Sequence, residues 1–71
     1  MENLRKIREL SGLSQIALAR RASISRARLQ LAESGDLTLK PEERESINRA
    51  LRDALAEHVT KVEGALVGTG T

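Results

Sequence analysis

Apolar residues recur at helical spacing along most of the chain, and the pattern predicts several short helices followed by one long helix. The clearest part holds two short amphipathic patterns, one that begins at Gln15 and one that begins at Arg26. Ser14 and Ser25 stand directly before them, and a serine at this position can accept a hydrogen bond from the first free N–H groups of a helix. The sequence therefore predicts two capped helices in close succession.

Only three residues separate these two helices, which forces a tight turn and brings their apolar sides together. A small residue is needed where the helices cross, and Ala19 meets this need. Gly35 tolerates the left-handed backbone that commonly follows a helix, so the second helix is expected to end near Ser34. We expect one inner face, formed by Leu18, Ala19, Ala22, Ile24, Leu29 and Ala32.

A shorter apolar pattern comes before this pair. Asn3 is placed to cap a first helix and Gly12 to end it. The residues expected on its buried side are Leu4, Ile7 and Leu10. Three further leucines outside the helices, Leu13, Leu37 and Leu39, are expected to cover the core.

A long amphipathic helix is predicted towards the C-terminus. Pro41 suits the first turn of a helix, and neither Gly nor Pro occurs from Glu42 to Glu63. The expected helix is about 20 residues and roughly 30 Å long, with apolar residues at Ile47, Leu51, Leu55, Val59 and Val62. We expect its first part to pack on the short helices and its second part to project beyond them. Residues 64–71 are expected to form a frayed tail, in which Leu66 and Val67 are available to a partner.

Charge is distributed unevenly along this small domain of 71 residues. Residues 1–30 hold seven Lys or Arg against two Asp or Glu, whereas residues 31–71 hold five against eight. A basic half favours a polyanionic partner, although a solvated charged face has the same composition. The chain has no aromatic residue on which single-stranded nucleic acid could stack. Double-stranded DNA is therefore the expected partner.

Several other classes of protein are disfavoured. The chain has no Cys and one His, which excludes disulfides and offers no set of ligands for zinc. No combination of nucleophile, base and orienting residue can be proposed, so we expect neither an enzyme nor a cofactor. Charged residues precede any apolar run at the N-terminus, which is unlike a signal peptide or a membrane span. A cytoplasmic protein that does not bind membranes is expected.

The window from Gln15 to Ser34 resembles the helix-turn-helix of phage repressor, Cro and Xre-type regulators, because the six residues of the inner face stand where that motif keeps apolar side chains. The similarity extends to both flanks, over roughly residues 4 to 55, through the runs L-R-K-I-R-E, G-L-S-Q and E-S-G. It implies an all-α bundle of four to five helices. One feature departs from the family, because Ser23 replaces the usual glycine of the turn. The family commonly breaks the last region into two helices, and whether the last helix of this chain is continuous or broken is left open.

The resemblance implies which residues contact DNA. The second helix of the motif enters the major groove, with Arg26, Ala27 and Leu31 facing the groove, and with Arg28 and Gln30 to the sides. The predicted base contacts are accordingly Arg26, Ala27, Arg28, Gln30 and Leu31. The predicted phosphate contacts are Ser14, Gln15, Ser34 and Lys40. The family also implies an ion pair between Arg8 and Glu33. Whether Ile16 is buried or exposed is left open.

Two functions are compatible with the pattern. The first is a sequence-specific regulator, a homodimeric repressor of a palindromic operator, in which residues 1–63 form the DNA-binding domain with its dimerisation segment. The residues expected to form the dimer are Leu55, Val59 and Val62. The alternative is an antitoxin-like protein that binds a partner protein and autoregulates its operon.

Overall fold

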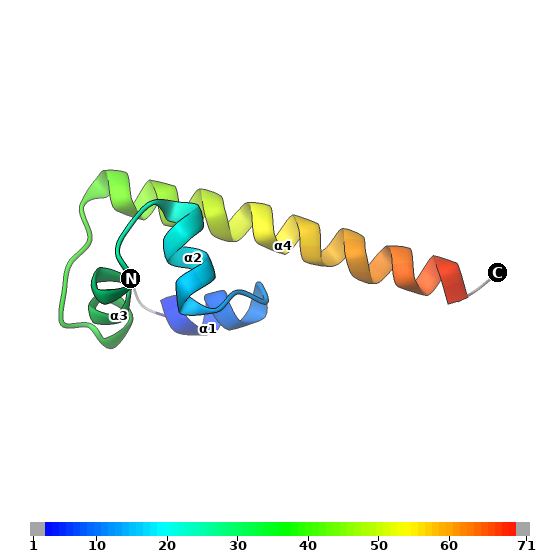
Figure 1. The fold of residues 1–71 in the computed structure, drawn as a ribbon, viewed down its shortest axis with the longest axis horizontal. Coiled ribbons are helices and arrows are strands. Elements are labelled where there is room, and N and C mark those ends of the chain that lie inside the picture. Colours follow the sequence, from blue (N-terminus) through cyan, green and yellow to red (C-terminus); the bar gives the residue numbers. More distant parts are fainter. Residues whose placement is uncertain (1–2, 70–71) are drawn as a thin grey trace.

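The protein is a small all-α bundle in which three short helices pack under one end of a long helix (Figure 1). The structure is a computed structural model and describes residues 3–69. The helices are α1 (Leu4–Leu10), α2 (Gln15–Ala22), α3 (Arg26–Ser34) and α4 (Pro41–Thr69). The all-α class and the helix-turn-helix formed by α2 and α3 agree with the prediction from the sequence.

The ends of the short helices follow the predicted local chemistry, with one exception. Ser14 accepts a hydrogen bond from the Ala17 N–H at 3.1 Å, and Ser25 accepts one from the Arg28 N–H at 3.1 Å. α3 ends at Ser34, and the following glycine has a left-handed backbone. Asn3 does not cap α1 with its side chain, so this expectation was wrong. Its own backbone is left-handed at φ 63°, whereas a capping residue needs an extended backbone to reach the first N–H groups.

The core lies where the three short helices meet the first half of α4. Its fully buried large side chains are Leu4, Leu18, Leu29 and Ile47. The predicted inner face of the helix-turn-helix is confirmed, since five of its residues are buried and Ile24 packs against the core from a half-buried position. Leu39 is buried, and Leu13 and Leu37 are half-buried against the core.

α1 is rotated relative to the expected orientation. Ile7 is 36% exposed and Leu10 is 65% exposed, while Arg8 and Ser11 are buried beside Leu4. The prediction that Ile7 and Leu10 face the core was therefore wrong. The rotation is fixed by polar bonds, because the Arg8 guanidinium donates to Glu33 and to the Leu13 carbonyl, and a buried charge must have such partners.

α4 is one continuous helix, and it is longer than predicted. α4 continues past the expected end at Glu63 to Thr69, so residues 64–69 of the expected frayed tail are helical. Gly64 and Gly68 each weaken a helix by about 1 kcal/mol relative to Ala, but extending an existing helix needs no new nucleus. Residues 70 and 71 of the predicted tail lie outside the described residues, as do the side chains of Val62, Leu66 and Val67.

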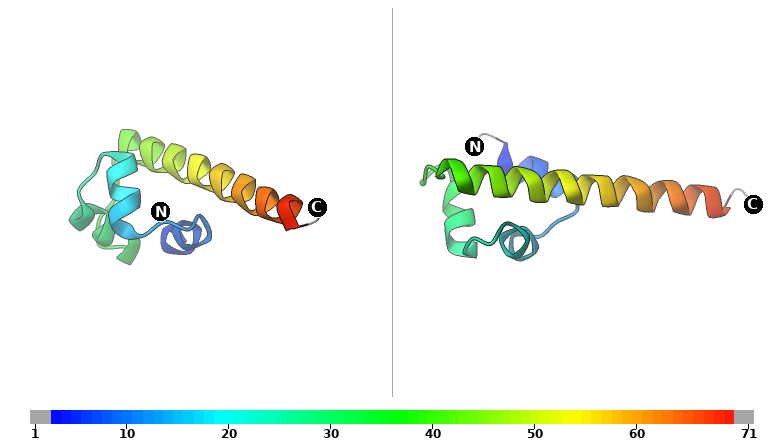
Figure 2. Two further views of the ribbon diagram at one scale, coloured as in Figure 1. Left: turned by 45° about the vertical axis from the view of Figure 1, so that its right-hand side comes forward. Right: turned by 90° about the horizontal axis from the view of Figure 1, so that it is seen from above.

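The long helix gives the molecule its shape. α4 packs mainly against α2, with α1 alongside, and its C-terminal part projects beyond the three short helices (Figures 1 and 2). The overall dimensions are 48 × 19 × 18 Å. Within the described part of the chain, no helix combines the length and the apolar character needed to cross a lipid bilayer.

Candidate nucleic-acid interface

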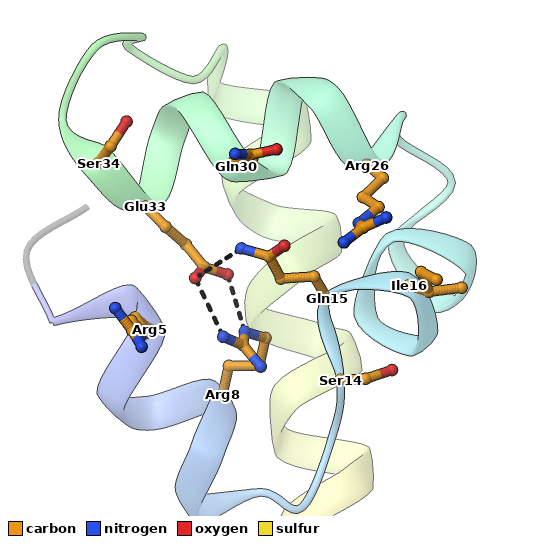
Figure 3. A pocket seen from close by; sticks show the side chains of 9 residues that line it. All are labelled: Arg5, Arg8, Ser14, Gln15, Ile16, Arg26, Gln30, Glu33 and Ser34. Carbon is orange, nitrogen blue, oxygen red and sulfur yellow. Dashed lines mark hydrogen bonds and ion pairs between the residues drawn. The ribbon is translucent and has the colours of Figure 1, made fainter.

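An open cleft lies between α1, the start of α2 and one side of α3 (Figure 3). Its volume is about 560 Å³, and two of the short helices and the N-terminus of a third border it. The residues that line it are Arg5, Arg8, Ser14, Gln15, Ile16, Arg26, Gln30, Glu33 and Ser34. Most of these side chains are polar, and three are arginines, so the cleft suits an anionic ligand.

The floor of the cleft is the ion pair between Arg8 and Glu33. Arg8 Nε lies 2.8 Å from Glu33 Oε2, and Arg8 Nη2 lies 3.2 Å from Glu33 Oε1. The two side chains are only 11% and 4% exposed. Arg8 Nη1 also donates to the Leu13 carbonyl at 2.9 Å, directly before the start of α2. The ion pair expected from the sequence is thus present, and it ties α1 to α3 and to the turn between α1 and α2.

Gln15 is held in place by the same carboxylate. Its Nε2 donates to Glu33 Oε1 at 3.3 Å, and Figure 3 shows its amide oxygen on the side away from Glu33. Ser14 precedes it and uses its hydroxyl oxygen as the acceptor for the helix cap, so the hydroxyl proton can still be donated outwards. The N-terminus of α2 therefore presents polar groups at the rim of the cleft.

α3 presents two adjoining stripes to solvent. Arg26, Gln30 and Ser34 are four residues apart, lie on one side of the helix and border the cleft. Ala27 and Leu31 are also four residues apart and lie on the neighbouring exposed side, where Leu31 is 43% exposed. α3 thus presents hydrogen-bonding groups beside an apolar strip.

Arg28 does not belong to this surface. Its Nε and Nη2 donate to the two carboxylate oxygens of Glu43, both at 2.8 Å, on the side of α3 that faces α4. In this structure the Arg28 side chain joins two helices, and its role as a base contact stays a prediction. The residue type and its place on α3 could not reveal this, because the acidic partner is fifteen residues away in the sequence.

Glu43 completes this junction. It accepts a hydrogen bond from the backbone N–H of Lys40 at 2.9 Å, as well as those of Arg28. These hydrogen bonds, of which that from Arg28 matters most, lower the pKa of Glu43 from its ordinary value of 4.5 to about 2. Lys40, one of the predicted phosphate contacts, stands at this junction and does not line the cleft.

The structure adds one residue to the cleft and settles the position of another. Arg5 lies on the cleft side of α1, where Nε donates to Glu9 Oε1 at 3.1 Å and the side chain remains 74% exposed. Arg5 is not among the predicted contacts, because the cleft that it borders forms only when three helices pack together. Ile16 is 46% exposed and borders the cleft. Ser34 also borders the cleft, but its hydroxyl lies 2.8 Å from Asp36 Oδ2 and is already engaged.

Comparison with known proteins identifies the arrangement. A family model described as a helix-turn-helix, of the Xre and λ-repressor type, matches residues 4–52, which span the three short helices and the first part of α4. The match includes all the residues that line the cleft. Neither a curated protein nor a solved structure matches the chain significantly.

Proposed function

Because the chain belongs to the helix-turn-helix family of DNA-binding transcription regulators, we propose that it is a small repressor that binds a palindromic operator as a homodimer. The observation that carries the proposal is that α3 and the N-terminus of α2 border the same cleft. In this arrangement one helix can enter the major groove while the other meets the adjacent phosphates.

Arg26 is the side chain that we assign to base recognition. It is exposed at the first position of α3 and has no ion-pair partner within residues 3–69. A free guanidinium can donate two hydrogen bonds to O6 and N7 of guanine, the commonest specific contact in the major groove. Ala27 and Leu31 offer apolar surface for thymine methyl groups, and Gln30 lies at the cleft side of the same helix. Each half-site is expected to contain a guanine beside one or two thymines.

The cleft itself is assigned to the sugar-phosphate backbone. Ser14 and Gln15 stand at the N-terminus of α2, where unpaired N–H groups favour an anion. Arg5 reaches the cleft from the opposite border and adds a cation. Backbone contacts of this kind set the position of α3 on the duplex but carry no sequence information.

Dimerisation is assigned to the projecting part of α4. Leu55 is half-buried, and Val59 is 52% exposed with no core residue to cover it. A two-fold dimer matches a palindromic site, and occupancy of a promoter by such a dimer blocks transcription without any further domain.

The proposal is tested by selecting binding sites for the full chain from random duplexes, followed by footprinting on DNA upstream of its own gene. We expect an enriched two-fold sequence with half-sites about one helical turn apart, protected on the upstream DNA. Repression of a reporter placed behind that site is the expected result in cells. Enrichment of an unrepeated site, or activation of the reporter, would contradict the proposal.

A further inference from the structure

A second exposed surface lies on the side of the molecule that does not face the cleft. Ile7 and Leu55 line one hollow between α1 and α4, and Leu10 and Val59 each lie about one turn further along the same helix. We refer to these four residues as the α1–α4 surface. Ile7 is 36% exposed, Leu10 is 65% exposed and Val59 is 52% exposed, and Leu55 is half-buried. None of the four lines the cleft. Contact with DNA at the cleft therefore does not account for the exposure of these apolar side chains.

A hollow is part of the same surface. It has a volume of about 280 Å³ between α1 and α4, and both Ile7 and Leu55 line it. Its other lining residues are Asn48, Leu51 and Arg52. The hollow stands beside the first half of α4, next to the part of the helix that projects.

The end of α1 marks where α4 begins to project. A side chain at Gly12 would come within 3.7 Å of His58 Nδ1, so the turn after α1 lies beside this level of α4. Beyond it α4 extends away from the three short helices (Figure 2). Short helices without tertiary packing are marginal in water. One chain thus carries both an open apolar hollow and an uncovered helix next to it.

Two charges flank the apolar residues of α4. Arg52 and Glu63 are exposed, and neither has an ion-pair partner in the described part of the chain. They are eleven residues apart, about three helical turns, and so lie on nearly the same side of α4. Leu55 and Val59 lie between them along the helix.

We propose that two copies of the chain pair through antiparallel α4 helices, with Leu55 against the partner's Val59 and Arg52 against the partner's Glu63. Both pairs are centred at residues 57–58, so one two-fold axis satisfies the apolar and the charged contacts together. The projecting helix of each copy then covers the hollow of the other, and Ile7 and Leu10 flank it. This inference rests on the proposed homodimer and specifies its geometry.

The geometry also brings both DNA-binding surfaces to one side. Leu55 and Val59 lie about a quarter turn around α4 from the core-facing Ile47. The two-fold axis of an antiparallel helix pair is perpendicular to both helices and to the line that joins them. Because the contact side lies about a quarter turn from the core-facing side, this axis is nearly parallel to the direction in which α4 faces the core. Both sets of short helices therefore lie on the same side of the helix pair. Glu43, which holds α3, is fourteen residues from the centre, or about 21 Å along the helix. In the dimer the two Glu43 residues are therefore about 42 Å apart along the helix pair, a distance of the order of one turn of DNA.

Charge reversal tests the pairing in the full chain. Arg52→Glu and Glu63→Arg are each expected to weaken dimerisation at least tenfold in sedimentation equilibrium, because a dimer contains two such pairs and reversal makes both repulsive. The double variant Arg52→Glu/Glu63→Arg is expected to return to within about threefold of the wild type, because it restores both attractions. Arg49→Glu, the same change on another side of α4, serves as the control and should leave the dimer intact.

The apolar contact has its own matched pair of variants. Val59→Glu should also weaken the dimer at least tenfold, whereas Ile16→Glu, the same kind of change at a similarly exposed residue by the cleft, should not. Helix content measured by circular dichroism establishes that each variant is folded. A monomeric wild type, unchanged dimerisation in the single reversals, or failure of the double variant to recover would overturn the pairing. Selection of a two-fold DNA site by the wild type is a separate result, so this surface can be wrong while the proposed function stands.

Discussion

At the scale of single side chains, Arg26 is the residue that we propose to read the DNA sequence. Replacing it with Ala should cost about 1–3 kcal/mol on the selected site and relax the preference at one guanine, because a bidentate contact is lost. Gln15→Ala should weaken binding to all duplexes by similar factors, since a phosphate contact carries no sequence information. Fluorescence anisotropy titrations on selected and random duplexes at two salt concentrations measure both effects.

Arg20→Ala is the control for this experiment, because Arg20 is exposed on α2 but does not line the cleft. It should change both affinities little beyond the general effect of net charge. An Arg26→Ala variant that loses the same factor on selected and random DNA would instead make Arg26 a backbone contact.

Arg8 shows how much one buried charge can contribute to stability. Its side chain is 11% exposed and makes two hydrogen bonds to Glu33 and one to the Leu13 carbonyl. Arg8→Ala leaves the Glu33 carboxylate buried without its cation, so we expect a loss of about 3–5 kcal/mol in urea unfolding. Arg5→Ala removes only an exposed pair on the same helix and should cost at most about 1 kcal/mol. Equal losses for the two variants would show that burial of the Arg8 pair has no energetic consequence.

Ser23 is a strained position in the turn of the helix-turn-helix. Its backbone is left-handed at φ 57°, a conformation that costs a non-glycine residue about 1 kcal/mol. Ser23→Gly should therefore raise the free energy of unfolding by up to about 1 kcal/mol, as measured in urea. Ser23→Ala keeps the Cβ atom and should give no such gain. A less stable glycine variant would mean that the serine side chain makes a compensating contribution.

The roles of residues that act on their close neighbours in the chain could be predicted from the sequence. The caps at Ser14 and Ser25 follow from a side chain and the N–H groups three residues ahead, so no tertiary information is needed. The role of Arg28 depends on Glu43, which only the folded arrangement of α3 and α4 brings within 2.8 Å. Arg5 was missed for the same reason, because only the packing of three helices makes the cleft that it borders.

At the scale of elements, the bond between α3 and α4 should respond to pH. The pKa of Glu43 is lowered from 4.5 to about 2, so its contribution to stability is fully present above pH 4.5 and is lost as the pH falls towards 2. Glu43→Gln should lower stability at pH 7, and the difference from the wild type should vanish by about pH 2. Urea unfolding at pH 7, 4.5, 3 and 2 measures this convergence.

Glu42→Gln is the matched control, because Glu42 is an exposed neighbour in the same first turn of α4. It should change stability little and should not show the same convergence with the wild type. A constant difference between Glu43→Gln and the wild type from pH 7 to pH 2 would contradict the link between this carboxylate and acid stability.

Helical periodicity predicted which segments are helices better than it predicted how they are rotated. The apolar spacing of Leu4, Ile7 and Leu10 suggested one buried side, but the buried guanidinium of Arg8 fixes α1 in another orientation. A hydrophobic pattern cannot weigh a satisfied ion pair against the exposure of two apolar side chains. The same pattern correctly predicted a long amphipathic last helix, but whether that helix is broken could not be predicted, and the structure shows it to be continuous.

At the scale of the whole molecule, removal of the projecting helix should separate folding from pairing. A chain that ends after Ala56 keeps all the buried residues of the core. We expect it to be a folded monomer that binds a single half-site but loses the affinity of the wild type for the two-fold site, because only a dimer engages both halves. Sedimentation and anisotropy titrations on one and two half-sites measure the change. A truncated chain that remains dimeric with unchanged affinity would place the interface elsewhere.

The continuity of α4 fixes both the distance and the angle between the start of this helix and its projecting part. No loop interrupts α4 from Pro41 to Thr69, so one continuous helix joins Glu43, which bonds Arg28 of α3, to the segment that we propose to pair. One residue inserted after Leu51 would turn everything beyond it by about 100° and advance it by about 1.5 Å, which swings the pairing side away from its partner. Seven inserted residues would nearly restore the angle while lengthening the rod by about 10 Å. In the proposed dimer, the distance between the two α3 helices can therefore change only in near-heptad steps, because an intermediate insertion turns the pairing side of α4 away from its partner.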